Sequence, residues 1–303
     1  MDGQRLAEVE PTLGYLLQSN TSPALVHVVQ IKHDSEEKLT WYEAYVDAHS
    51  GDLLSVTDFV ADLTYTVLPI KKIALPDGLE TLVDPENLAS SPNGWVTTTT
   101  TAGNNVVSYK GSTSAVSSEP FTYVYDNTLA PATAVNVNAS RVNAFYIVNT
   151  VHDAWYQYGF TETSFNFQAD NFGKGGSGND RVLMSVQDAS GTNNANFATP
   201  PECVFFLSPL LLYLLLTMFP LLCSGQSGQC RMFIWTLTTP NRDGVFDTSI
   251  PVHENTHGLT NRLTGGGTGR CLQTTEAGGM GEGWSDAMAE YVPLSFPLLC
   301  ETD

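Results

Sequence analysis

The sequence predicts an α+β protein, with a β-rich N-terminal part and a helical part that follows it. Two patterns lead to this expectation. Residues 63–119 are rich in Thr, Val, Tyr, Gly and Asn, and apolar residues recur at helical spacing from about 140 to 158. Strand-forming residues broken by turn residues favour short strands, whereas a 3.6-residue apolar period favours a helix. With 303 residues, 42% of them apolar, the chain can bury a sizeable core.

The first strands are predicted around a turn near residue 50. Residues 40–46 and 53–56 alternate in polarity on either side of the turn residues 49–52, which is typical of a β-hairpin. Farther along the chain, Val96 and five threonines form the run 96–101. Because β-branched residues favour strands, we expect this run to lie in an antiparallel or mixed sheet.

The helix predicted over about 140–158 should pack its apolar stripe against the sheet and end at Gly159. His152 lies on this stripe, where a packed core histidine is more common than a metal ligand. The glycine-rich segment 172–178 precedes a strand-like run, 181–186, but lacks the Gly-Lys-Ser/Thr ending of a phosphate-binding loop. We therefore expect a surface loop there.

The net charge of the chain limits the kinds of molecule that it is expected to bind. Thirteen basic and 32 acidic residues give a formal net charge of −19, which repels nucleic acid and anionic lipid. The five cysteines form no Cys-x-x-Cys pair, and their odd number does not predict a complete disulfide framework. The first residues lack the basic start and apolar stretch of a secretory signal.

Residues 204–223 carry no charge and are long enough to cross a membrane as a helix. Against a membrane span, the run contains Pro209 and Pro220, and no Lys or Arg flanks it before Arg231. A single-span membrane protein is therefore one alternative. The interpretation that we prefer is an anomalous apolar insertion, residues 203–224, within one domain, with no membrane partner.

The motif His-Glu-x-x-His is the strongest chemical signal. His253 and His257 are four residues apart, so on a helix both rings project from one face and can reach a single ion, with Glu254 beside it. We expect this helix to begin near residues 247–249 and to end before the glycines 265–267. Alone, the motif also fits two surface histidines on an ordinary helix.

A downstream pair of carboxylates favours the metal site. A catalytic zinc ion commonly has three protein ligands and an open fourth position. Glu282 is the expected third ligand, and Asp286, four residues later on a second helix, can accept a hydrogen bond from a ligand histidine. In such a site the metal acidifies a water molecule, and Glu254 takes its proton and passes it to the leaving amine of a peptide.

Residues 252–266 and 278–286 resemble the fungalysins, extracellular fungal zinc metalloendopeptidases with a thermolysin-like fold. The similarity covers most of residues 60–292 and includes further matching segments at 171–176, 180–183, 193–201 and 234–236. The resemblance implies a thermolysin-like α+β fold, one zinc ion (Zn2+), protein or peptide substrates, and secretion. It also implies that residues 1–60 are the remnant of a propeptide, which acts as an inhibitor in such a zymogen.

The resemblance carries over to individual positions. It implies that His253, His257 and Glu282 bind the zinc ion, that Glu254 is the catalytic base, and that Asp286 supports a ligand from the second shell. More weakly, Asn194 and Ala195 resemble the edge-strand segment that pairs with the substrate backbone.

Several features depart from the family. The aromatic residue that frequently follows the motif's Glu is Asn255 here, and the family continues into a helical subdomain where this chain stops, at Asp303. We therefore expect the catalytic domain, 61–303, to be incomplete. The segments 203–224 and 292–303 share Phe-Pro-Leu-Leu-Cys, and we hypothesise that both are translated introns or similar gene-model errors.

The first interpretation is thus a zinc endopeptidase, and the second is a non-catalytic zinc-binding fragment or pseudoenzyme. The sequence does not indicate the cleavage specificity or the residue that stabilises the oxyanion.

Overall fold

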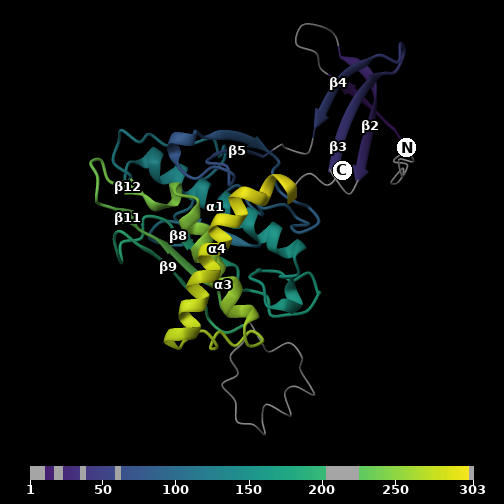
Figure 1. The fold of residues 1–303 in the computed structure, drawn as a ribbon. Coiled ribbons are helices and arrows are strands. Elements are labelled where there is room, and N and C mark those ends of the chain that lie inside the picture. The colour runs from purple at the N-terminus through teal and green to yellow at the C-terminus, as the bar shows by residue number, and fades with distance from the viewer. Residues whose placement is uncertain (1–10, 17–22, 35–38, 59–62, 203–224, 300–303) are drawn as a thin grey trace. The chain divides into compact units, whose positions relative to one another are not determined.

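The computed structural model of the chain describes residues 11–16, 23–34, 39–58, 63–202 and 225–299. These residues belong to two compact units, Met1–Leu63 and Thr64–Asp303 (Figure 1). Each unit is described below by itself. The apolar run 204–223, and with it the predicted insertion, lies outside the described residues.

The first unit is a four-stranded antiparallel sheet. Its strands follow the chain order across the sheet: β1 (Thr12–Leu16), β2 (Ala24–Asp34), β3 (Leu39–Asp47) and β4 (Leu53–Asp58). The predicted β-hairpin is confirmed, because β3 and β4 pair in antiparallel fashion. The turn between them is stabilised by Asp47 Oδ1, which accepts hydrogen bonds from the backbone N–H groups of His49 at 2.8 Å and Ser50 at 2.9 Å.

The second unit contains a mixed four-stranded sheet of order β7-β8-β10-β9. Its strands are β7 (Val106–Tyr109), β8 (Val182–Ser185), β9 (Ala195–Ala198) and β10 (Gln229–Met232). The pairs β7–β8 and β8–β10 are parallel, whereas β10–β9 is antiparallel. Strand β9 therefore forms one edge of this sheet.

Two short antiparallel ribbons complete the strands of this unit. They are β5 (Thr64–Val67) with β6 (Glu80–Val83), and β11 (Ile234–Trp235) with β12 (Arg242–Asp243). The prediction of a strand over 96–101 is wrong. The run consists of bends with one isolated antiparallel bridge, from Thr100 to Ser118. The Thr101 N–H donates to the Ser117 carbonyl and the Glu119 N–H to the Thr99 carbonyl, so the run contacts residues 117–119 without forming a strand.

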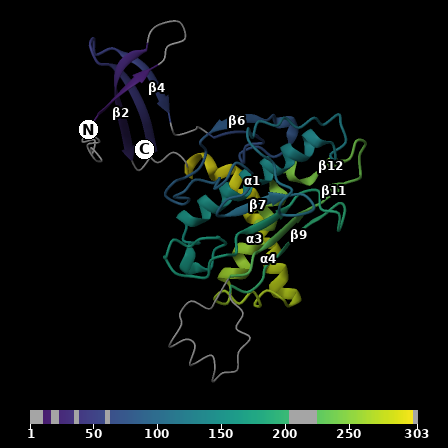
Figure 2. The same cartoon turned by 180° about the vertical axis from the view of Figure 1, so that it is seen from behind.

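Three helices are described, α1 (Ala134–Gln157), α3 (Ser249–Leu263) and α4 (Thr275–Leu299). Helix α1 packs on β5, β7 and α3, and α3 packs in turn on β9 and α4 (Figures 1 and 2). The strands together with these helices confirm the mixed α+β class. None of the described helices combines the length and apolar character that a membrane crossing requires.

Helix α1 begins six residues earlier than predicted and is buried on most of its circumference rather than along one stripe. Many of its buried residues are polar and hydrogen-bond to neighbouring elements. The Asn143 side chain accepts from the backbone N–H of Leu68 at 2.7 Å and donates to the Val245 carbonyl at 3.2 Å. Such bonds satisfy buried polar groups and fix α1 against segments far away in the sequence.

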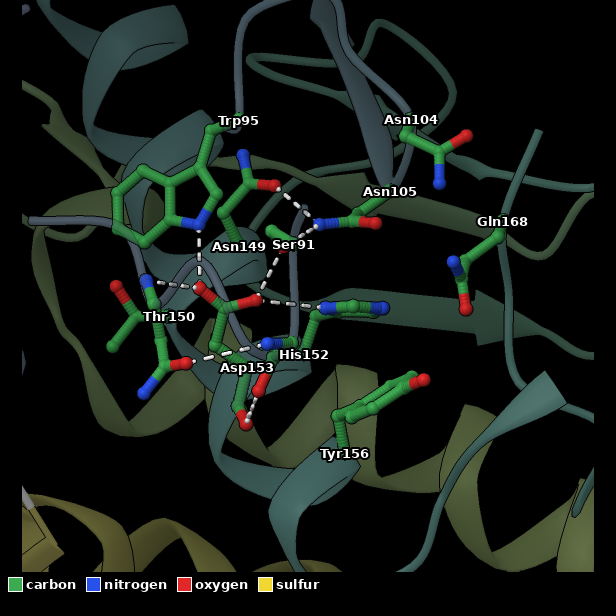
Figure 3. A network of polar contacts seen from close by, with 12 residues as sticks. Ser91, Trp95, Asn104, Asn105, Asn149, Thr150, His152, Asp153, Tyr156 and Gln168 are labelled. Atoms are coloured by element: carbon green, nitrogen blue, oxygen red, sulfur yellow. Dashed lines mark hydrogen bonds and ion pairs between the residues drawn. The ribbon is translucent and has the colours of Figure 1, made fainter. Parts of the chain in front are cut away.

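One buried network lies around Asp153 near the end of α1 (Figure 3). Its carboxylate accepts hydrogen bonds from Trp95 Nε1 at 2.7 Å and from Ser91 Oγ at 2.5 Å, and it lies 3.0 Å from His152 Nδ1. His152 is 8% exposed and belongs to no metal-competent group among the described residues. It is a packed core histidine, as predicted.

Candidate metal centre

Helix α3 carries the His-Glu-x-x-His motif. It begins at Ser249 and ends at Leu263, as predicted, and Asp247 Oδ1 accepts hydrogen bonds from the Ser249 backbone at 3.2 Å and hydroxyl at 2.5 Å. The rings of His253 and His257 lie side by side, with centroids 4.8 Å apart and planes at 82°. Their four-residue spacing thus directs both rings to one side of the helix.

Helix α4 brings Glu282 to these rings. Glu282 Oε2 lies 3.2 Å from His253 Nε2 and 3.4 Å from His257 Nε2. Ligand atoms of the three residues all lie within 4.8 Å of one another, and this is the only such group among the described residues. The two histidines are one turn apart on α3, but Glu282 joins them only because α4 packs along α3.

These three donors fit a zinc ion. At the usual Zn–N lengths of about 2.0–2.1 Å and Zn–O lengths of about 2.0–2.2 Å, a nitrogen and an oxygen ligand on a tetrahedral zinc ion are about 3.3–3.5 Å apart. The two measured N–O separations, 3.2 and 3.4 Å, agree with that value. Two imidazoles and one carboxylate are also a common donor set for catalytic zinc. The residues therefore suit the metal on both geometry and chemistry.

The other ring nitrogens of both histidines face α4 as well. His253 Nδ1 lies 2.9 Å from Asp286 Oδ1, which is the contact that the sequence predicted for Asp286. His257 Nδ1 lies 3.2 Å from the hydroxyl of Ser285, a contact that the sequence analysis missed. Both partners come from the same turn of α4, so this turn contacts each imidazole on the side opposite the shared donor cluster.

Glu254 lies between the two histidines in sequence and is 7% exposed. Burial raises the pKa of its carboxyl to about 7, with Glu282 adding to the shift and His253 opposing it. Burial also lowers the pKa of His257, which favours the neutral imidazole that can bind a metal. A carboxyl with a pKa near neutrality can exchange protons readily at neutral pH.

A pocket of about 420 Å³ adjoins the cluster. The edge strand β9 forms one wall, and Asn194 and Ala195, the predicted substrate-binding residues, line it together with His253, Glu254 and His257. Ala195 pairs with Met232 of β10, and no described strand pairs with the other side of β9. The pocket therefore has an open strand edge beside the metal-competent group.

A glycine directly after His257 allows this close approach. A Cβ atom on Gly258 would lie 2.8 Å from Phe197 Cζ and 3.0 Å from the Phe167 ring. Phe197 belongs to β9, so any side chain at position 258 would push the edge strand away from α3. The position of β9 beside the cluster thus depends on this glycine.

The last turn of α3 is held by Arg262. Arg262 is fully buried, and its guanidinium pairs with Asp180 at 3.2 Å and with Glu202. It donates to the Pro200 carbonyl at 2.9 Å and to the Gln226 carbonyl at 2.8 Å. Arg262 therefore connects α3 with the chain on both sides of residues 203–224.

The sequence matches the model of the family described as Fungalysin metallopeptidase (M36) over residues 64–205 and 217–296. The match is interrupted over residues 206–216, within the apolar run, and it continues to residue 296. It therefore covers 203–205 and 217–224 of one segment predicted to be an intron, and 292–296 of the other. The intron hypothesis itself stays a prediction.

Curated fungal relatives align with nearly the whole chain. Extracellular metalloproteinase MEP of Pyricularia oryzae is 39% identical over 321 residues, covering 98% of this chain and 46% of the relative. Extracellular metalloproteinase mep of Aspergillus flavus is 39% identical over 307 residues, covering 95% of this chain and 44% of the relative. Extracellular metalloproteinase 9 of Coccidioides posadasii is 37% identical over 329 residues, covering 99% of this chain and 47% of the relative.

The chain spans about half the length of these curated relatives. The family model nevertheless matches well over half of the chain, including both α3 and α4. Together with the metal-competent group on these two helices, the match identifies the chain as a member of the fungalysin (M36) metallopeptidase family.

Proposed function

We propose that this protein is a zinc-dependent endopeptidase, in which His253, His257 and Glu282 bind one zinc ion and Glu254 is the general base. The observation that carries the proposal is the convergence of three metal-binding side chains, at separations suited to zinc, beside a carboxyl group with a raised pKa. Membership of a metallopeptidase family supports it. A thermolysin-like arrangement of the whole catalytic domain is part of the same proposal.

Bound zinc would supply a Lewis acid that polarises a peptide carbonyl and lowers the pKa of water. The residues of the chain perform the proton transfers. Glu254 accepts a proton at its carboxylate as water attacks the carbonyl carbon, and it then delivers that proton to the departing amine nitrogen. Because Glu254 is largely shielded from solvent, its carboxylate is a stronger base than an exposed one.

The substrate backbone is proposed to pair with the free edge of β9. An extended peptide can add to an exposed strand edge through main-chain hydrogen bonds, which gives affinity without reading side chains. Asn194 and Ala195 lie at the start of this edge and line the same pocket as Glu254. A peptide bound there would present a carbonyl to the metal site, so protein substrates of broad sequence follow from this geometry.

Secretion and autoinhibition complete the proposal. The relatives named above are extracellular metalloproteinases, which supports an extracellular site of action. Residues 1–60 are proposed to derive from a propeptide that restrains the enzyme before maturation. The four-stranded sheet of the first unit lies within that segment.

The substitution Glu254→Gln tests the mechanism. It removes the base but keeps a similar shape, so hydrolysis of casein should fall by about 10²- to 10⁴-fold while the zinc content stays at one ion per chain. Glu290→Gln is the matched control, because Glu290 is an exposed carboxylate on the same helix as Glu282. A chain that retains zinc yet cleaves nothing, even without substitution, would support the non-catalytic alternative instead.

A further inference from the structure

The two proposed histidine ligands differ in how their Nδ1 atoms are held. His253 Nδ1 faces the carboxylate of Asp286, whose side chain is 74% exposed. His257 Nδ1 faces the hydroxyl of Ser285, which is fully buried in the interface between α3 and α4. One ligand is thus supported by a charged group in contact with water, and the other by a neutral group inside the protein.

We propose that Ser285 is a positioning residue that holds His257 in the tautomer with the proton on Nδ1. This inference rests on the proposed zinc site. A neutral imidazole has one N–H donor and one acceptor nitrogen, and the hydrogen bond made by one nitrogen decides the role of the other. If Nδ1–H donates to Ser285 Oγ over the observed 3.2 Å, the lone pair of Nε2 is free.

The direction of that lone pair matters for the metal. His257 Nε2 lies 3.4 Å from the Glu282 carboxylate, so in this tautomer two acceptors face each other. Two hydrogen-bond acceptors at this distance repel each other unless a cation lies between them. A metal ion can be that cation, and His253 Nε2, which also lies close to Glu282, can bind the same ion. The Ser285 hydrogen bond therefore prepares His257 for metal binding and also fixes the plane of its ring.

Burial makes the Ser285 contact durable. Asp286 is exposed to water, which competes for its hydrogen bonds, whereas no solvent reaches Ser285. Ser285 also brings no charge into the buried interface, where an unpaired carboxylate would be costly. A serine at this position thus combines close helix packing with one hydrogen-bond acceptor for His257.

The test compares zinc affinity across three residues at position 285. Ser285→Ala should weaken zinc binding by about 10- to 100-fold, the usual effect of losing such a supporting contact. Ser285→Cys has a weaker acceptor of similar size, so its zinc affinity should lie between those of the unsubstituted chain and Ser285→Ala. Affinity would be measured by competition with a chromogenic chelator, and circular dichroism would confirm that each variant is folded.

A second readout separates positioning from packing. In the zinc-loaded protein, the Nδ1–H proton of His257 should be protected from solvent exchange and visible by NMR, and Ser285→Ala should accelerate its exchange. Ala289→Gly is the matched control, because Ala289 is a small buried residue one turn later on α4 and bears no hydrogen-bonding side chain. It should destabilise the helix by about 1 kcal/mol without changing zinc affinity.

The outcomes distinguish this inference from the proposed function. If the unsubstituted chain binds zinc and Ser285→Ala binds it equally tightly, the inference is wrong and the zinc site stands. If Ala289→Gly weakens zinc binding as much as Ser285→Ala does, Ser285 acts through packing alone and the inference is also wrong. An unsubstituted chain that binds no zinc would overturn both.

Discussion

Helix α3 carries two ionic clusters that differ in the origin of their cation. At the end of the helix, the carboxylates of Asp180 and Glu202 surround the guanidinium of Arg262, so the chain itself supplies the positive charge. In the middle of the helix, the Nε2 atoms of His253 and His257 lie 3.2 and 3.4 Å from Glu282 Oε2, with no Lys or Arg in the group. The first cluster contains its own cation, whereas the second is proposed to bind a cation from solution.

The two clusters also differ in burial, and the difference fits their roles. The Arg262 and Asp180 side chains are fully buried, whereas Glu282 is 63% exposed. Burial raises the pKa of the Asp180 carboxyl and the nearby Glu202 adds to the shift, whereas the Arg262 guanidinium opposes it. A structural ion pair can be fully buried away from solvent, but a catalytic metal ion must remain accessible to water and substrate.

Removing the internal cation should have the largest effect. Arg262→Met leaves two buried carboxylates without a partner, so the free energy of unfolding should fall by about 3–5 kcal/mol. Urea denaturation of the variant and the unsubstituted chain measures this difference. Arg242→Met is the control, because Arg242 is exposed and should change stability by no more than about 0.5 kcal/mol. A loss of that small size for Arg262→Met would show that the cluster does not stabilise the fold.

A partly buried carboxyl, with no cation paired to it among the described residues, extends the comparison. Glu86 Oε2 is buried and has no hydrogen-bond partner among the described residues. Burial is the main cause that raises the pKa of Glu86 from 4.5 to about 7, and Asp84 and Asp153 add to the shift. This carboxyl is therefore expected to be protonated in the native state under mildly acidic conditions.

Stability should respond to pH accordingly. Between pH 4.5 and about 7 the native state holds a proton that the unfolded chain has released, so the free energy of unfolding should fall as the pH rises through this window. The fall can reach about 3 kcal/mol, and Glu86→Gln should remove most of it. Urea titrations at several pH values measure the slope. An unchanged slope in Glu86→Gln would mean that another group causes the pH dependence.

The sequence predicted the features that one helix determines by itself. The relation of His253 to His257, and of Glu282 to Asp286, follows from a spacing of four residues, because helical geometry brings such residues to one face. Local patterns also located the hairpin near residue 50 and the ends of α3. These features need no information about how the elements pack.

Contacts between segments far apart in the chain could not be predicted from the sequence in the same way. The partners of Arg262 lie 82 and 60 residues away, at Asp180 and Glu202, and no periodicity in the sequence links them. Ser285 contacts His257 only because α4 packs on α3, and its place between Trp284 and Asp286 gives no signal of that contact. The strand predicted over 96–101 shows the same limit, because strand propensity did not reveal that the run pairs with residues 117–119 through only one isolated bridge, Thr100 to Ser118.

Adding zinc should produce the smallest of these stability effects, and it tests the comparison most directly. Zinc at 100 times its dissociation constant should stabilise the chain by about 2.7 kcal/mol, because it binds a group that exists only in the folded state. The measurement is urea denaturation with zinc, without zinc, and with zinc plus excess EDTA. Glu282→Gln should lose this gain because it removes the negative ligand, whereas Glu290→Gln should keep it. If Glu282→Gln gained as much as the unsubstituted chain, zinc would be acting elsewhere, and the contrast between an internal and an external cation on α3 would fail.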